Sequence, residues 1–183
     1  MQQKIILRKK YYNLRKKKYY EINKNFFFPL LKLIRSKFKK KPIKIAIYYP
    51  SNYELNVLKF LDFNNVLIND FLLPVINNNN LMNFFSWKKN DLLFVNKFGI
   101  LEPAETQVKV PDLMLVPILA YDKNKYRLGY GKGFYDRYLN KQIKQFKNIL
   151  TVGVAFSFQR YHKLPIKKND VQLNYIITEK GIY

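Results

Sequence analysis

The sequence predicts an α/β fold, arranged as a single three-layer domain over residues 1–183 with a mainly parallel or mixed central sheet and flanking helices. Short apolar runs typical of buried strands alternate with segments of helical character, which is the pattern of βαβ units. The length of 183 residues suits one domain with its own core. Neither an internal repeat nor a linker divides the chain.

The first half of the chain is predicted to begin with two helices. The first is expected from apolar residues such as Ile5, Ile6, Leu14 and Ile22, spaced through a basic segment whose long Lys stems stay solvated. Pro29 favours the start of the second helix. The elements expected in this half are helices over 4–24 and 26–38, a strand over 43–48, a helix over 55–67 and a strand over 70–75.

The second half is predicted to contain most of the strands and one helix. The run DLMLVPIL at 112–119 is apolar throughout, which is typical of a strand buried on both faces. Residues 81–110 carry the weakest pattern. The elements expected in this half are a polar loop at 77–80, a strand at 92–95, a turn within 96–103, strands at 112–119, 150–156 and 174–181, and a helix that begins within 127–139.

Composition excludes several classes of protein. The chain has no cysteine, so it has no disulfide framework and no thiolate metal site. Neither a signal peptide nor an apolar run of the roughly 20 residues that span a bilayer is present, so we expect a cytoplasmic protein and no membrane partner. The net charge of +22 has two explanations, namely binding of polyanions or a genome rich in A and T, which favours Lys, Asn, Ile, Phe and Tyr codons.

A glycine loop is the most informative motif. In RLGYGKGFYDR (127–137), glycines at alternating positions allow close approach of the backbone to a ligand, and their N–H groups with the next helix N-terminus form an anion site. Arg127 and Lys132 add charge suited to phosphate, and Asp136 offers oxygen ligands to magnesium. The loop matches neither a Walker loop nor a dinucleotide fingerprint. Spacing alone also fits a tight turn with packing glycines.

The stretch DLMLVPILAYDKNKYRLGYGKGFYDRYL (112–139) resembles the signature of the 5-formyltetrahydrofolate cyclo-ligase family, in which an apolar strand, a proline and an aspartate precede RLGxGxGxYD. A basic N-terminal helix and four further segments match the family in the same order, namely YYPSNYE (48–54), NKFGILEP (96–103), VGVAFSFQ (152–159) and LPIKKNDV (164–171). The resemblance covers nearly the whole chain and is strongest over 96–170. The chain departs from the family at Lys125, where a glycine is usual.

The resemblance implies an ATP- and magnesium-dependent conversion of 5-formyltetrahydrofolate to 5,10-methenyltetrahydrofolate, with release of ADP and phosphate. ATP activates the formyl oxygen, and the nitrogen at position 10 then attacks. Such phosphoryl transfer depends on positioning and charge neutralisation rather than on a protein nucleophile. We therefore expect Mg²⁺ as cofactor, ATP as co-substrate, small-molecule substrates as the partners, no specific nucleic acid, and a monomer.

The same resemblance assigns roles to individual residues. The residues expected to bind ATP are Lys4, Arg8, Arg127, Leu128, Gly129, Tyr130, Gly131, Lys132, Gly133, Phe134 and Tyr135. Those expected to bind the folate are Tyr49, Glu54, Tyr130, Gly131, Lys132, Gly133 and Phe134. Arg127 and Lys132 would act catalytically by neutralising charge on the transferred phosphoryl group. Asp136 and Asp170 would hold magnesium.

Each assignment has a structural alternative. Lys4 and Arg8 stand at i and i+4 on one helix face, but solvated charge is common in so basic a helix. Glu54 also suits a first helical turn. Asp170 also suits a turn. The single tryptophan, Trp87, is placed near the folate pocket, and the single histidine, His162, is expected at the surface.

The alternative function is a basic RNA-binding protein without enzymatic activity. It would use the positive charge and the interleaved aromatic residues, which make up 17% of the chain, to hold phosphates and stack bases. The sequence contains no recognisable RNA-binding module. A degenerate remnant of the enzyme is a further alternative, and the intact glycine loop argues against it.

Overall fold

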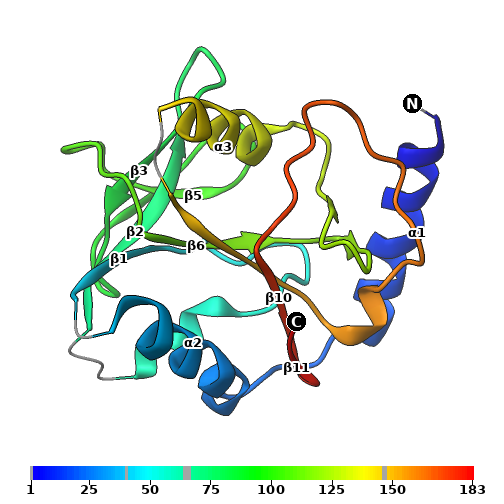
Figure 1. The fold of residues 1–183 in the computed structure, drawn as a ribbon. Helices are drawn as coiled ribbons and strands as arrows, with labels where there is room; N and C mark the ends of the chain where they lie inside the picture. Colours follow the sequence, from blue (N-terminus) through cyan, green and yellow to red (C-terminus); the bar gives the residue numbers. More distant parts are fainter. Residues whose placement is uncertain (1, 40, 64–66, 146–147) are drawn as a thin grey trace.

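The computed structural model describes residues 2–39, 41–63, 67–145 and 148–183, and its central feature is a mixed, mainly parallel sheet (Figure 1). The strands of this sheet are β1 (Ile43–Ala46), β2 (Ile68–Ile76), β3 (Met82–Ser86), β6 (Leu113–Pro117), β9 (Leu150–Val154), β10 (Tyr175–Thr178) and β11 (Gly181–Ile182). They lie in the order β11-β10-β9-β6-β1-β2-β3. The strands from β10 to β2 are parallel, and the two edge strands are antiparallel. The predicted α/β class is confirmed.

Helices cover both faces of the sheet, as the alternating side chains of β6 require. Leu113 and Leu115 belong to one core cluster, which also contains α2 (Phe28–Phe38) and the 3₁₀ segments η1 (Lys24–Phe27) and η2 (Val57–Asp62). Met114 and Val116 point to the other face and pack in a second cluster with α3 (Phe134–Lys144). Figure 1 shows α2 and α3 on opposite sides of the sheet. The result is three layers.

The first helix, α1 (Gln2–Lys18), lies at the end of the sheet rather than over a face (Figure 1). Leu7 and Tyr11 pack in a third cluster with Leu119, Ala120, Leu128 and Leu164. Two small hairpins lie outside this sheet, formed by β4 (Leu93–Val95) with β5 (Leu101–Pro103) and by β7 (Ala120–Tyr121) with β8 (Arg127–Leu128).

The structure corrects the prediction for the first helix. It ends at Lys18 instead of continuing to 24, and its last turn is entirely basic, which suits the negative end of the helix dipole. The expected apolar residues Ile5 and Ile6 are 59% and 62% exposed, because the buried face carries Leu7, Tyr11 and Arg15 instead.

The helix predicted over 55–67 is also wrong where the structure describes it; residues 64–66 lie outside the described ranges. Glu54 closes a turn back to Ser51, with its N–H 2.8 Å from the Ser51 carbonyl oxygen, and only a 3₁₀ helix follows. Val57 and Phe60 stand three residues apart and are both fully buried, a spacing that places them on one side of a 3₁₀ helix. In the weakly patterned region, strand β3 was not predicted.

Candidate active site

A cavity of about 420 Å³ opens at the carboxyl ends of β1 and β6, the edge at which α/β sheets bind ligands. Its volume is in the range of small-molecule sites. Every residue that the sequence assigned to a site lines it, namely Lys4, Arg8, Tyr49, Glu54, Arg127, Leu128, Gly129, Tyr130, Gly131, Lys132, Gly133, Phe134, Tyr135, Asp136 and Asp170. The structure thus brings together segments that are as far apart in sequence as α1 and the 164–171 segment.

The glycine loop forms one wall of this cavity between β8 and α3. Gly131 and Gly133 have φ angles of 105° and 70°, a region that residues with a side chain rarely adopt. Gly133 is the N-cap of α3, so the first free N–H groups of that helix lie beside the cavity. A Cβ atom at Gly131 would lie 3.0 Å from Cζ of Arg8, so a side chain there would displace the Arg8 guanidinium.

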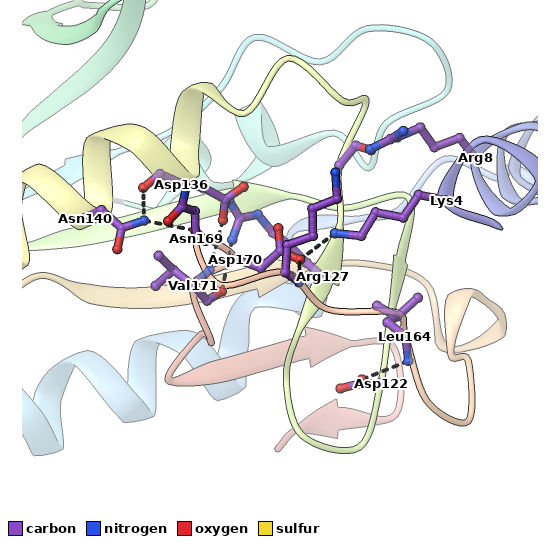
Figure 2. A network of polar contacts seen from close by, with 12 residues as sticks. Lys4, Arg8, Asp122, Arg127, Asp136, Asn140, Leu164, Asn169, Asp170 and Val171 are labelled. Atoms are coloured by element: carbon purple, nitrogen blue, oxygen red, sulfur yellow. Dashed lines mark hydrogen bonds and ion pairs between the residues drawn. The ribbon is translucent and has the colours of Figure 1, made fainter. Parts of the chain in front are cut away.

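Helix α1 contributes two cations to the site. Arg8 donates from Nε to the carbonyl oxygen of Gly129 at 2.9 Å, which joins the helix to the glycine loop. Lys4, one turn earlier, forms an ion pair with Asp170 (Figure 2). Figure 2 shows Lys4 extending from α1 toward Asp170, with Arg8 projecting from the same side of the helix. The predicted i, i+4 face therefore points into the cavity.

The carboxylates predicted to hold a metal are each paired with a cation. Arg127 Nη2 lies 2.9 Å from Asp136 Oδ1, and the same oxygen accepts the N–H of Val171 at 3.1 Å (Figure 2). Asp170 Oδ2 pairs with Lys4 and accepts the N–H of Lys167 at 2.7 Å. Since Val171 directly follows Asp170, the contact from its N–H to Asp136 keeps the two carboxylates adjacent. Among the described residues, no group of three or more His, Cys, Asp and Glu side chains could hold a metal alone.

Glu54 is a buried part of the cavity lining. Its Oε2 accepts hydrogen bonds from the backbone N–H of Ser51 at 3.0 Å and from the Ser51 hydroxyl at 3.3 Å. Burial raises the pKa of this carboxyl, and the Ser51 N–H, the charge of Arg15 and the hydroxyl of Tyr130 partly oppose the increase. A buried carboxylate of this kind is stabilised most by a ligand that donates hydrogen bonds to it.

Aromatic side chains also line the cavity. Tyr49 and Phe134 both border the cavity, and the Phe98 ring lies 5.6 Å from that of Phe134. Trp87 is not in the lining; it is buried behind Tyr49, with the two ring centroids 6.4 Å apart. His162 is exposed, as predicted.

Sequence reasoning missed two features of this site. Phe98 stands at the tip of the β4–β5 hairpin, where Asn96 Oδ1 accepts the N–H groups of Phe98 and Ile100 at 2.8 and 3.0 Å. Glu102 holds the Asn96 side chain at 2.6 Å. The second feature is Arg15, which is 1% exposed behind the cavity. The only sequence signal for Arg15 is its position on the Lys4, Arg8 and Tyr11 face of the helix.

No helix among the described residues is both long enough and apolar enough to span a membrane. This finding agrees with the absence of an apolar run of that length in the sequence.

Known proteins resemble the chain in sequence and in fold. It is 32% identical over 136 residues to the 5-formyltetrahydrofolate cyclo-ligase of Haemophilus influenzae, covering 70% of this chain and 72% of that protein. It is 31% identical over 110 residues to a probable 5-formyltetrahydrofolate cyclo-ligase of Schizosaccharomyces pombe. That match covers 52% of this chain and about half, 54%, of the yeast protein.

The fold matches the solved structure of the Aquifex aeolicus 5,10-methenyltetrahydrofolate synthetase with a TM-score of 0.76. The sequences are 31% identical, and the match covers 98% of this chain and 91% of the other. The family model described as the 5-formyltetrahydrofolate cyclo-ligase family matches residues 3–179. The chain therefore belongs to the 5-formyltetrahydrofolate cyclo-ligase family.

Proposed function

We propose that the chain converts 5-formyltetrahydrofolate to 5,10-methenyltetrahydrofolate at the expense of ATP, with release of ADP and phosphate. The observation that carries the proposal is the convergence on one cavity of a glycine loop, the cations of α1, two adjacent carboxylates and a buried glutamate. These are the groups needed to bind a triphosphate, a metal and a folate side by side.

ATP phosphates would bind between α1 and the glycine loop. Lys4 and Arg8 approach from the helix, and Arg127 and Lys132 from the loop. The N–H groups at the start of α3 supply further donors, and the helix dipole favours negative charge there. Tyr135 lines the same cavity, and its buried hydroxyl has no hydrogen-bond partner among the described residues.

Asp136 and Asp170 would hold magnesium. Magnesium is usually bound through one or two carboxylates together with substrate phosphates and water, so two adjacent carboxylates beside a phosphate site fit this ion. When bound, it would neutralise charge on the phosphate oxygens. Lys4 and Arg127 pair with these carboxylates. Both cations would be drawn to the phosphates when ATP binds, which exposes carboxylate oxygens to the ion.

The folate would lie against the opposite wall. The Glu54 carboxylate would accept hydrogen bonds from the donor groups of the pterin ring, and the rings of Tyr49 and Phe134 suit a flat heterocycle. The formyl group would then lie between the folate wall and the glycine loop, within reach of the terminal phosphate.

The reaction needs no protein nucleophile. The terminal phosphoryl group of ATP moves to the formyl oxygen, and ADP leaves. The nitrogen at position 10 then attacks the activated formyl carbon and loses its proton, and the carbon–oxygen bond breaks to release phosphate. Arg127 and Lys132 would neutralise the charge that develops on the transferred group. Such electrostatic stabilisation supplies most of the rate enhancement in phosphoryl transfer.

The test is a spectrophotometric assay for 5,10-methenyltetrahydrofolate with purified protein and with ATP or magnesium omitted in turn. We expect product only in the complete mixture. Product without ATP, or none in the complete mixture, would contradict the proposal. Salt-sensitive binding of mixed RNA in a protein that shows no folate-dependent ATP hydrolysis would favour the RNA-binding alternative.

A further inference from the structure

Arg15 of α1 is a charged side chain in the protein interior, with 1% of its surface exposed. Among the described residues it has no carboxylate partner at ion-pair distance, and its Nε atom has no hydrogen-bond partner. Burying a charge is costly unless the charged group is paired or hydrogen-bonded. Those contacts therefore indicate what the residue does.

The guanidinium joins three segments that border the cavity. Nη1 donates to the carbonyl oxygen of Ile118, just beyond β6, at 3.1 Å. Nη2 donates to the carbonyl oxygen of Asn52 at 2.8 Å and also to the hydroxyl of Tyr130 in the glycine loop. Its planar fork can hold several acceptors in fixed directions, which a lysine ammonium does less well.

The segment held through Asn52 is strained. Asn52 and Tyr53 have φ angles of 49° and 62°, so two successive residues with side chains adopt the left-handed region just before Glu54. Such residues persist only where their surroundings fix them, and they concentrate at ligand-binding sites. Besides the Arg15 hydrogen bond, the rings of Tyr12 in α1 and of Tyr19 just after α1 pack against Tyr53, with centroids 6.4 and 6.1 Å apart.

Tyr130 connects the same guanidinium to the folate wall. The residue is 42% exposed, while its hydroxyl reaches the buried Arg15. Tyr130 and Glu54 both line the cavity, and Tyr130 lowers the pKa of the Glu54 carboxyl. The hydrogen bonds from Arg15 to Tyr130 and to Asn52, two residues before Glu54, therefore form a polar chain from the interior to the cavity.

We infer that Arg15 is a positioning residue, which fixes the strained turn and the Tyr130 hydroxyl so that Glu54 is presented to the folate. The inference rests on the proposed function of the site. It gives α1 a second role. The helix would contribute Lys4 and Arg8 to the phosphate site, and through Arg15 it would also position the folate site.

The polar chain also affects the protonation of Glu54. The groups that face its carboxyl are Arg15 of α1, Tyr130 of the glycine loop, Tyr48 beyond β1 and Tyr135 of α3. Arg15 and Tyr130 both lower the pKa of Glu54 against the effect of burial. Removing either group should therefore raise this pKa. If the ionised carboxylate binds the folate, the acid limb of kcat/KM for the folate should move to higher pH.

The experiment compares Tyr130→Phe, Arg15→Met, the double variant and Arg15→Lys with wild type. We expect Tyr130→Phe to raise the KM for 5-formyltetrahydrofolate about 5- to 20-fold, as for loss of one charge-assisted hydrogen bond, with much less change in the KM for ATP. Arg15→Met should also raise the KM for the folate. The KM of the double variant should be no higher than that of Arg15→Met, and Arg15→Lys should restore part of the wild-type affinity. The acid limb of kcat/KM for the folate should move to higher pH in Arg15→Met and in Tyr130→Phe.

Lys16→Met is the matched control, because Lys16 is exposed on the next position of the same helix. It should leave both Michaelis constants and the pH profile unchanged. If Arg15→Met lowers only the Tm, or if Tyr130→Phe leaves the folate KM and the acid limb at their wild-type values, Arg15 is a packing residue and the inference is wrong. If the wild-type protein itself shows no activity, the result contradicts the proposed function instead.

Discussion

The guanidinium of Arg127 lies 2.9 Å from the carboxylate of Asp136, and only 4% of the Arg127 side chain is exposed. A residue from the loop that would bind phosphate is thus held by the residue that would bind magnesium. The pair holds both side chains at the cavity. It also means that each residue has a structural role that must be separated from its role in catalysis.

Asp136→Asn separates the two roles. The change is nearly isosteric, but it weakens the partner of a buried guanidinium, so we expect the free energy of unfolding to fall by about 1–3 kcal/mol. Turnover should fall at least about tenfold, and the magnesium concentration needed for half-maximal rate should rise. Asp62→Asn is the control, since Asp62 pairs with Lys89 at the surface and should contribute little. A magnesium titration identical to wild type would show that Asp136 only holds Arg127.

The two glycines Gly129 and Gly131 should differ sharply when replaced by alanine. At Gly131 the φ angle is 105° and a Cβ atom would meet the Arg8 guanidinium, whereas at Gly129 no atom lies within 4 Å of such a Cβ. Gly131→Ala should cost about 1–2 kcal/mol of stability and raise the KM for ATP. Gly129→Ala should stay within about 0.5 kcal/mol of wild type. Equal effects in thermal unfolding and kinetics would contradict the observed loop conformation.

Glu54 should make stability depend on pH. Burial raises its pKa above the ordinary value of 4.5, so the folded protein holds this proton more tightly than the unfolded chain. The ionisation of Glu54 therefore costs stability as the pH rises from 4.5 to the raised pKa, and the full cost applies at all higher pH. Glu54→Gln removes the cost. The Tm of the variant minus that of wild type should increase through this window, while folate binding is lost.

Glu21→Gln provides a control of opposite sign. The Tyr19 hydroxyl lowers the pKa of Glu21, so this carboxylate contributes stability at higher pH, which is lost as the pH falls through its folded pKa. The Tm difference for Glu21→Gln should therefore become more negative as the pH rises. If both variants show the same trend, the carboxyl of Glu54 is not disfavoured by its surroundings.

Lys132→Ala tests whether the glycine loop binds phosphate at close range. Lys132 lies over the Phe98 ring, with Nζ 5.1 Å from its centroid, at the cavity. Its loss should raise the KM for ATP or lower turnover about 10- to 100-fold, as for a charge-assisted contact. Lys32→Ala removes an exposed charge from α2 and should have little effect, because such charges are screened beyond about 10 Å. Equal losses would indicate that bulk positive charge holds the nucleotide.

Much of the site could be predicted because its residues lie in an unusual local pattern. The alternating glycines with Arg127 and Lys132 carry their chemistry within a few positions, and the apolar run of β6 fixes where the loop leaves the sheet. The departure from the family at Lys125 does not disrupt the turn. Lys125 adopts a φ of 63°, and its N–H donates to the carbonyl oxygen of Asp122 at 3.0 Å.

The rest depends on contacts between distant segments. Arg15 stands in a helix crowded with lysine and arginine, and only the tertiary fold distinguishes a buried cation from its solvated neighbours. Phe98 has no periodic pattern around it and is placed by Asn96 and Glu102. The helix that was predicted to follow Glu54 is absent because of such tertiary contacts, since a turn stabilised by Arg15 and Ser51 replaces its first turn.

The most direct test of the central claim follows the formyl oxygen. The enzyme would be supplied with 5-formyltetrahydrofolate that carries heavy oxygen in the formyl group, together with unlabelled ATP and magnesium in ordinary water. Transfer of the terminal phosphoryl group to that oxygen predicts one heavy oxygen atom in each phosphate released, as measured by mass spectrometry, in equal amount to the methenyl product. Phosphate that carries no label, or label that appears only in water, would contradict the proposed chemistry.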